Sequence, residues 1–358
     1  MPPLVKFMLR RLALIPVTML IVTAVLYGIV MFTPAEARAQ LYLSNSDGID
    51  RMSEAELQRL IERIIHEHGL NDPYPVQYVN WVGSLIGGGW GWSPVYRAQV
   101  LDLIQARAPI TIELTMWAML TFIPTGILSG VIASRQRGKL IDRVFGLTSF
   151  GATAIPPFVL GLMMISFLYV GLGWFAPGRL SAPIEVVVNA ANFQEFTGMY
   201  TLDGLLNGRL DVSLDALQHL VMPVVALSAL HWATVGRVMR TTMVEELDKD
   251  YVTAAQARGV SDNRIVWKHV LRNALIPALT TSVLSAASLV SGVYVIERVF
   301  NLHGVSEIIA GTGLAGFGDA PLALGFAVYS VSVVLIVMFA LDVAQAVVDP
   351  RLRERLTE

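Results

Sequence analysis

Long stretches without charged residues constrain the fold of this chain more than any other feature. A helix needs about 20 consecutive apolar residues to cross the roughly 30 Å hydrocarbon core of a membrane. Of the 358 residues, only 15% are charged, against about 25% in soluble domains. The sequence therefore predicts an all-α polytopic membrane protein with six spans. The predicted spans are Leu12–Phe32, Ile110–Ala133, Val144–Val170, Leu220–Gly236, Ala274–Ile296 and Pro321–Leu341.

The composition also excludes several classes of function. A net charge of −2 gives no electrostatic support for bulk nucleic-acid binding. Because the chain has no cysteine, it has no disulfide framework, no thiolate chemistry and no Cys-ligated metal site. We expect no metal site and no catalytic residues on this chain.

The orientation follows from the lysines and arginines, which concentrate in cytoplasmic loops of membrane proteins. Most of the 26 Lys and Arg residues fall inside if the N-terminus is cytoplasmic. Both termini are then predicted to be cytoplasmic. The predicted inside segments are 1–11, the link between the second and third spans, 237–273 and 342–358. The predicted outside segments are 33–109, 171–219 and 297–320.

The first apolar run has an alternative interpretation as a cleaved signal peptide, since basic residues precede it and an A-x-A-like stretch follows within Ala35–Gln40. The run is 21 residues long, whereas the apolar region of a signal peptide spans about 7–15. We therefore favour a retained span.

The first outside segment predicts a folded cap. Ser53 and Glu56 form a capping box before the helical stretch Ser53–His68, and Asn71–Pro75 should end that helix. Glycines interleaved with Trp90 and Trp92 predict a turn at the membrane surface. We expect the cap to pack on the bundle, and we favour partner docking over substrate docking.

The second outside segment, 171–219, is mostly polar and carries Asp203, Asp211 and Asp215. The three acids lack the spacing of a calcium-binding loop, so we expect an ordinary solvated loop. The motif G-x-G-x-x-G at 311–316 follows no βαβ pattern, so we expect a flexible connection or a re-entrant piece there and no dinucleotide site.

Several of the predicted spans contain polar residues or prolines, which could have a function. Charged groups are costly in a membrane, but Glu113 lies near the predicted outer boundary and should be solvated. His231 should hydrogen-bond within the bundle. Pro124 and the pair Pro156–Pro157 remove backbone donors and should kink or break their helices.

A stripe of small residues in the fifth span could serve two purposes. Its members recur at helical spacing and should share one face, which favours close helix packing. The same face could line a translocation pathway. The stripe consists of Thr281, Ser285, Ser288 and Gly292.

The long cytoplasmic loop is the most informative part of the chain. Asp248–Gly259 predicts a short helix that ends at a glycine, and Ser261 can cap a second helix, Asp262–Asn273, which leads into the fifth span. A small helix between two spans is suited to dock on a soluble partner, or it could be an amphipathic helix that closes the bundle.

These residues resemble the cytoplasmic loop of type I ABC importer permeases, whose pattern is E-A-A-x-x-x-G. The match runs from Thr253 to Gly259, although Thr253 replaces the glutamate. The stretch His269–Pro277 resembles the H-x-L-R-N-A-L-x-P signature of the oligopeptide/dipeptide permeases. The DPYPVQY segment at Asp72–Tyr78 and the tail Val348–Arg353 extend the likeness over nearly the whole chain.

The resemblance implies a non-catalytic membrane subunit of an ATP-driven importer, in a prokaryotic cytoplasmic membrane. Its partners would be a second permease, one or two ATPase subunits that carry ATP and Mg²⁺, and an extracytoplasmic substrate-binding protein. No cofactor is expected on this chain, which has no G-x-x-x-x-G-K-[ST] motif. The implied ATPase-coupling residues are Asp250, Tyr251, Val252, Thr253, Ala254, Ala255, Gln256, Ala257, Arg258 and Gly259.

The substrate stays open at this point. Peptides are the first hypothesis, and oligosaccharides, nickel chelates or haem are alternatives within the same class of transporter. A stand-alone channel or ion-coupled carrier is the alternative of a different class, which should show buried midplane charges and inverted repeats.

Overall fold

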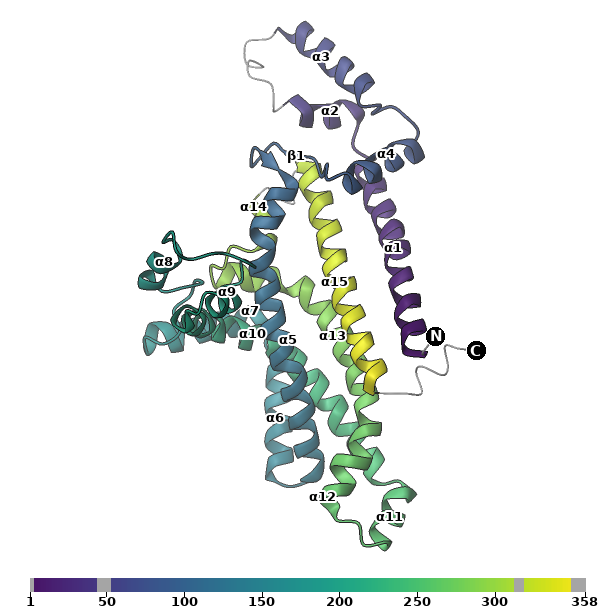
Figure 1. Ribbon diagram of the computed structural model, residues 1–358, viewed down its shortest axis with the longest axis vertical. Helices are drawn as coiled ribbons and strands as arrows, with labels where there is room; N and C mark the ends of the chain where they lie inside the picture. Colours follow the sequence, from purple (N-terminus) through teal and green to yellow (C-terminus); the bar gives the residue numbers. More distant parts are fainter. Residues whose placement is uncertain (1–2, 44–52, 312–318, 349–358) are drawn as a thin grey trace. The chain divides into compact units, whose positions relative to one another are not determined.

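The computed structural model describes residues 3–43, 53–311 and 319–348, which form two compact units. Unit 1 draws on 1–12, 109–303 and 334–358, and unit 2 on 13–108 and 304–333. The G-x-G-x-x-G motif from residue 312 onward and the tail beyond Val348 lie outside the described residues. In chain order (Figure 1), the elements are α1 (Pro3–Val30), α2 (Ala35–Leu43), α3 (Glu54–Glu67), α4 (Tyr74–Ile86), β1 (Trp92–Ser93), β2 (Ala98–Gln99), α5 (Val100–Arg135), α6 (Leu140–Ala154), α7 (Pro157–Met164), η2 (Ile165–Gly171), α8 (Ala182–Val188), α9 (Tyr200–Leu206), α10 (Leu210–Leu247), α11 (Asp250–Ala257), α12 (Asp262–Arg264), η3 (Ile265–Val270), α13 (Leu271–Val299), α14 (Val305–Gly311) and α15 (Ala320–Val348).

Among the described residues, five helices are long and apolar enough to cross a membrane by themselves. They are α1, α5, α10, the continuous run from α12 to α13, and α15. The region of the third predicted span holds two helical pieces, 140–154 and 157–171, bent by 102°. The bend lies at Pro156–Pro157, as expected from two successive residues without an N–H donor.

Helix α10 is much longer than the charge-free run within it. It covers 38 residues, whereas the predicted span Leu220–Gly236 was the shortest of the six. A charge-free run marks the part of a helix that suits hydrocarbon. It does not mark the ends of the helix, which continue through charged turns.

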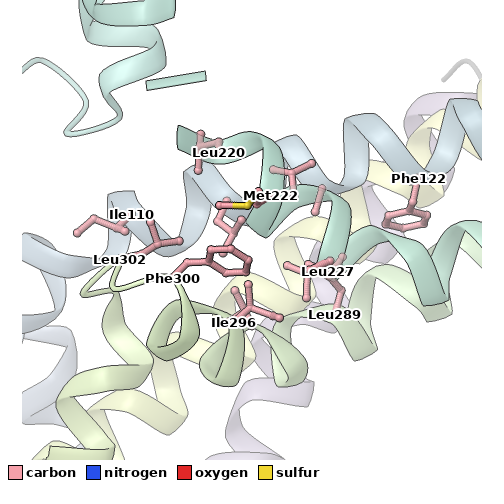
Figure 2. Close-up of a cluster of buried hydrophobic side chains, with 14 of the residues drawn as sticks. Ile110, Phe122, Leu220, Met222, Leu227, Leu289, Ile296, Phe300 and Leu302 are labelled. Carbon is pink, nitrogen blue, oxygen red and sulfur yellow. The ribbon is translucent and has the colours of Figure 1, made fainter. Parts of the chain in front are cut away.

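The core of unit 1 is apolar and forms where α5, α10 and α13 meet. Phe122 from α5, Leu227 from α10 and Leu289 from α13 are almost fully buried there (Figure 2). Helix α10 packs most extensively against α13 and also contacts α6, α7 and α9.

Glycines allow three of these helices to approach closely. A Cβ on Gly130 of α5 would lie 2.6 Å from the carbonyl oxygen of Gly236 in α10. A Cβ on Gly236 would in turn lie 3.0 Å from the ring of Phe145 in α6. Close backbone approach through small residues is a common way for membrane helices to associate.

Unit 2 contains the expected cap. The capping box of Ser53 and Glu56 begins α3, as predicted. The helix ends at Glu67, before the segment Asn71–Pro75 that was expected to end it, and Tyr74 and Pro75 already lie in α4. Arg38 of α2 is buried and donates to the side chain of Gln77 in α4 and to the carbonyl of Leu70. The glycine turn leads into an antiparallel hairpin of β1 and β2.

The hairpin is tied to the beginning of α15 through Asp319. The carboxylate accepts hydrogen bonds from the Ser93 hydroxyl and from the Leu322 backbone N–H. Burial raises the pKa of Asp319.

Candidate functional site

Helix α11 occupies the loop between α10 and α13 and presents two different faces. Val252 and Ala255 are buried in an apolar cluster with Met243 of α10 and Val270 of η3. The other face is exposed, so α11 is anchored by one side and open on the other. The exposed residues of the helix are Asp250, Thr253, Ala254, Gln256 and Ala257, and Arg258 and Gly259, which follow it, are exposed as well.

This arrangement divides the alanines of the sequence motif. Ala254 lies on the open face, whereas Ala255 is 8% exposed and packs against the chain itself. Within Asp250–Gly259, Val252 and Ala255 therefore support the helix and only their neighbours are available to another protein.

The end of α11 is a Schellman motif. Gly259 has φ of 75°, which an L side chain rarely adopts, and its N–H donates to the carbonyl of Gln256 over 2.8 Å. The N–H of Val260 donates to the carbonyl of Ala255 over 3.1 Å. These are the two hydrogen bonds of that motif, and they confirm the predicted helix end at the glycine.

A carboxylate at the end of α10 organises the base of the loop. Glu246 accepts hydrogen bonds from the Tyr251 hydroxyl at 2.8 Å and from the Asn273 side chain at 3.3 Å, and it pairs with Lys249. Burial and this carboxylate raise the pKa of Tyr251. The phenol therefore stays protonated and hydrogen-bonded at neutral pH.

The second predicted helix of the loop begins where expected, but without the expected cap. Ser261 is the N-cap residue of α12, yet its side chain makes no capping hydrogen bond. Ser261 is therefore confirmed as the residue at which the helix begins, whereas the expected hydrogen bond from its side chain is absent. Helix then continues through the π-helical turn η3 into α13, so the loop joins the span without a break.

The small-residue stripe on α13 lies in two environments. Ser285 is buried and Thr281 half-buried, whereas Ser288 and Gly292 are exposed. Among the described residues, a Cβ on Gly292 would have no heavy atom within 4 Å apart from the nearby backbone of its own helix. Close packing within this chain therefore does not explain the glycine.

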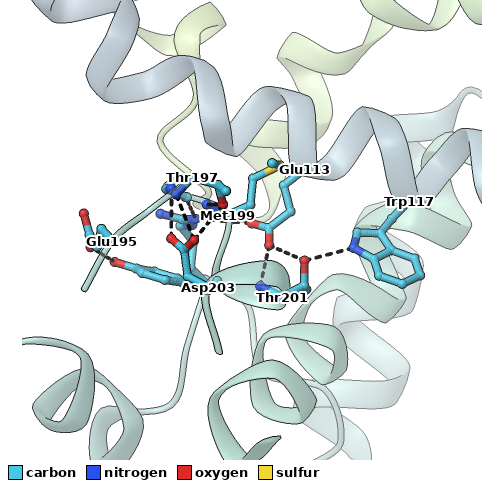
Figure 3. Close-up of polar contacts among 10 residues, drawn as sticks. Glu113, Trp117, Glu195, Thr197, Met199, Thr201 and Asp203 are labelled. Atoms are coloured by element: carbon cyan, nitrogen blue, oxygen red, sulfur yellow. Dashed lines mark hydrogen bonds and ion pairs between the residues drawn. The ribbon is translucent and has the colours of Figure 1, made fainter. Parts of the chain in front are cut away.

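Glu113 is buried and paired, which corrects the expectation of a solvated carboxylate. It is 3% exposed and accepts hydrogen bonds from the N–H and hydroxyl of Thr201 at 2.8 and 2.7 Å (Figure 3). Arg179 forms an ion pair with it at 3.2 Å. Trp117 of α5 donates to the same Thr201 hydroxyl. The network attaches α9 to α5.

The segment 171–219 is folded, and the expectation of an ordinary solvated loop was wrong. It contains α8, α9 and the beginning of α10. Asp203 is fully buried and accepts hydrogen bonds from Thr197 and from the Gly198 N–H. Asp215 accepts from the Ser181 N–H at 2.8 Å, and Asp211 pairs with Arg209 in solvent. Each acid therefore has a hydrogen-bond or ion-pair partner within unit 1.

His231 of α10 and an ion pair between α6 and α10 are two further polar features of unit 1. His231 is 8% exposed, with its ring 5.4 Å from that of Phe122. Asp142, which the sequence did not single out, is buried and bound by the guanidinium of Arg240, with 2.7 Å between Nη2 and Oδ2. The acid and the base lie 98 residues apart in the chain, so no local pattern marks the pair.

Comparison with known proteins decides the family. The family model described as "Binding-protein-dependent transport system inner membrane component" matches residues 123–354. The chain belongs to this family. It is a multi-pass permease subunit of an ABC transport system, and the type I permease fold expected from the sequence is confirmed.

Named relatives cover most of the permease. It is 31% identical to the di/tripeptide transport system permease protein of Pseudomonas aeruginosa, over 98% of this chain and all of the relative. It is 34% identical to the oligopeptide transport system permease protein of Bacillus subtilis, over 84% of this chain and 86% of the relative. The probable D,D-dipeptide transport system permease protein of Escherichia coli is 32% identical over 85% of this chain and 86% of the relative.

Proposed function

We propose that the permease is a non-catalytic subunit of an ATP-driven importer of peptides and forms half of the translocation pathway. The names of its relatives, which specify di/tripeptides, oligopeptides and D,D-dipeptides, support peptides as the substrate class. The membrane is the cytoplasmic membrane of a prokaryote, with both termini inside. Oligosaccharides, nickel chelates and haem are the alternative substrates.

The observation that carries the coupling role is the two-faced packing of α11. Its apolar side is fixed on α10 and η3, and its outer side presents Ala254 and Ala257 beside the polar Thr253 and Gln256. Small side chains on an exposed helix let another protein surface approach closely. We therefore assign the outer face of α11 to an ATPase subunit.

The remaining partners follow from the same assignment. ATP and Mg²⁺ bind to the ATPase subunits, and this chain carries no cofactor. A binding protein delivers the substrate outside, and a second permease supplies the other half of the pathway. The exposed part of the α13 stripe, Ser288 and Gly292, faces that second permease or the pathway.

Co-purification tests the assignment. The permease, tagged in its native host and extracted in mild detergent, should retain a second permease and ATPases with Walker motifs, identified by mass spectrometry. Retention of no ATPase would refute the coupling role and favour a stand-alone channel or ion-coupled carrier.

A bulky residue on the outer face tests α11 itself. Ala254→Trp should abolish ATPase retention without loss of the folded permease, because the side chain points to solvent. Arg143→Trp is the matched control, since Arg143 is also exposed but lies on α6. Equal ATPase retention by both variants would show that α11 does not dock.

Uptake measurements decide the substrate. Proteoliposomes that contain the purified complex and its binding protein should accumulate labelled di- and oligopeptides when ATP is supplied. Accumulation of oligosaccharides, a nickel chelate or haem instead would reject the peptide assignment and leave the coupling assignment intact.

A further inference from the structure

Two polar contacts join the region of the turn between α5 and α6 to the segments that flank α11, and a third joins α6 to α10. Arg135 donates to the side chain of Asn263 at 3.3 Å, beyond the C-terminal end of α11. Arg137 pairs with Asp248 at 3.2 Å, just before α11 begins. Arg240 binds the carboxylate of Asp142 with two nitrogens. The turn and the helix end beside it therefore contact the chain on both sides of α11, at Asp248 and at Asn263.

The Asp142–Arg240 pair is the most protected of the three contacts. The side chain of Asp142 is 8% exposed and that of Arg240 33%, against 62% and 69% for Arg137 and Asp248. Asp142 also accepts a hydrogen bond from the N–H of Gly138, over 2.9 Å. One carboxylate thus fixes the turn and joins it to α10. A fork-shaped guanidinium also fixes the orientation of its partner, which a single point charge does not.

The helices beside this pair are packed closely enough to move together. Gly130 of α5 lies against the backbone of α10 at Gly236, one helical turn before Arg240, and Phe145 of α6 lies against Gly236. Tight packing of this kind transmits displacement because interiors deform little.

We propose that Asp142 and Arg240 are positioning residues for coupling, and that they keep the turn 136–139 fixed to α10 while the ATPase moves α11. The displacement then reaches α5 and α6 as well as α10 and α13. The inference rests on the proposed docking of an ATPase on α11.

Charge removal and charge exchange test the pair in the intact complex. Asp142→Asn and Arg240→Gln should lower the amount of peptide transported per ATP hydrolysed by about fivefold or more, the lower limit of typical coupling effects. ATPase retention should not change. The exchanged double variant, D142R with R240D, should recover part of the wild-type ratio, because it restores the ion pair but not the acceptor for the Gly138 N–H. Recovery shows that the two residues act as a pair, and unchanged ATPase retention separates a loss of coupling from a loss of stability.

Arg209→Gln and Asp211→Asn are matched controls, since they remove the same charges from an exposed ion pair. The proposal is overturned if the single variants transport like these controls, or if the exchanged variant is no better than the single ones. If the wild-type permease retains no ATPase, the proposed function itself has failed, which is a distinguishable result.

A second measurement keeps the proposal testable if the single variants do not fold. The chain has no natural cysteine, so R137C with D248C can be joined by a short bis-maleimide in an otherwise cysteine-free permease. A fixed turn predicts that the joined complex transports at the wild-type rate. If the crosslinked variant loses transport while the same variant without crosslinker still transports, the turn moves away from α10 during the cycle and the proposal is overturned.

Discussion

The carboxylate of Glu113 joins several distant residues, although it lies in an apolar run of the sequence. Two donors from Thr201 and an ion pair with Arg179 satisfy it, and the guanidinium of Arg179 also lies 4.0 Å from the ring centre of Tyr200. A buried charge is tolerated when it is paired and hydrogen-bonded in this way.

Removal of this carboxylate should therefore loosen the segment 171–219. Glu113→Ala leaves two buried donors of Thr201 without their acceptor, at a cost of about 1–3 kcal/mol each. Limited proteolysis in detergent should then cut between α8 and α9 faster than in the wild type. Glu113→Gln, which keeps an acceptor oxygen, should show a smaller increase, and equal cutting of all three proteins would contradict the proposed attachment.

The carboxyl of Asp319 makes the hairpin sensitive to pH. Its pKa is raised by burial, so folding favours the protonated form. The associated stability is present below the unfolded-state pKa of about 3.9 and is lost as pH rises through the folded-state value.

Asp319→Asn should remove that dependence, because an amide mimics the protonated carboxyl. Hydrogen exchange of residues 92–99, corrected for its intrinsic pH dependence, should accelerate in the wild type as pH rises and stay level in the variant. Parallel profiles for the two proteins would show that Asp319 does not control the hairpin.

Sequence reasoning found some of these residues and missed others for a physical reason. The capping box at Ser53 and the glycine end of α11 depend on neighbours within a few residues, so their patterns are visible in the sequence. Thr201 and Arg179 lie 88 and 66 residues from Glu113. Burial that depends on such distant partners leaves no local pattern.

At the scale of elements, the hydrophobic runs predicted where the helices lie more accurately than they predicted where each helix begins and ends. The runs predicted the apolar part of each span, and Pro156–Pro157 predicted the break between α6 and α7. They did not show that α10 continues for 38 residues, because charged turns outside the hydrocarbon can remain helical. Helix α11 was predicted from residue types, whereas its division into a packed and an open face needed the structure.

The contact of α5 with α10 depends on the absence of a side chain at Gly130. Gly130→Leu should disrupt it, because even a Cβ would lie 2.6 Å from a backbone oxygen. We expect a lower yield of monodisperse protein and a lower unfolding temperature in fluorescence-detected size-exclusion experiments.

Gly146→Ala is the matched control for that contact. Gly146 lies within α6 with no atom near its hypothetical Cβ, so alanine should be neutral or stabilise the helix by about 0.5–1 kcal/mol. If both substitutions had the same effect, close packing would not be the role of Gly130.

At the scale of the whole molecule, the predicted orientation can be read with single cysteines, because the chain contains none. A membrane-impermeant maleimide should label V186C, on α8, in intact cells. It should label A257C, on α11, only after the membrane is permeabilised. Both residues are exposed, so the reverse pattern would invert the topology and place α11 out of reach of any cytoplasmic ATPase.

The bend of 102° between α6 and α7 has a consequence for the stability of a newly made copy of the chain in the membrane. Two adjacent prolines leave backbone carbonyls without intrahelical donors near the middle of an apolar segment, and lipid offers no donor to replace them. Neither piece, at 15 residues, spans roughly 30 Å unaided. Each piece must therefore rely on its packing against other helices to stay in the membrane, and we expect a copy made without its companion subunit to have a shorter lifetime in the cell.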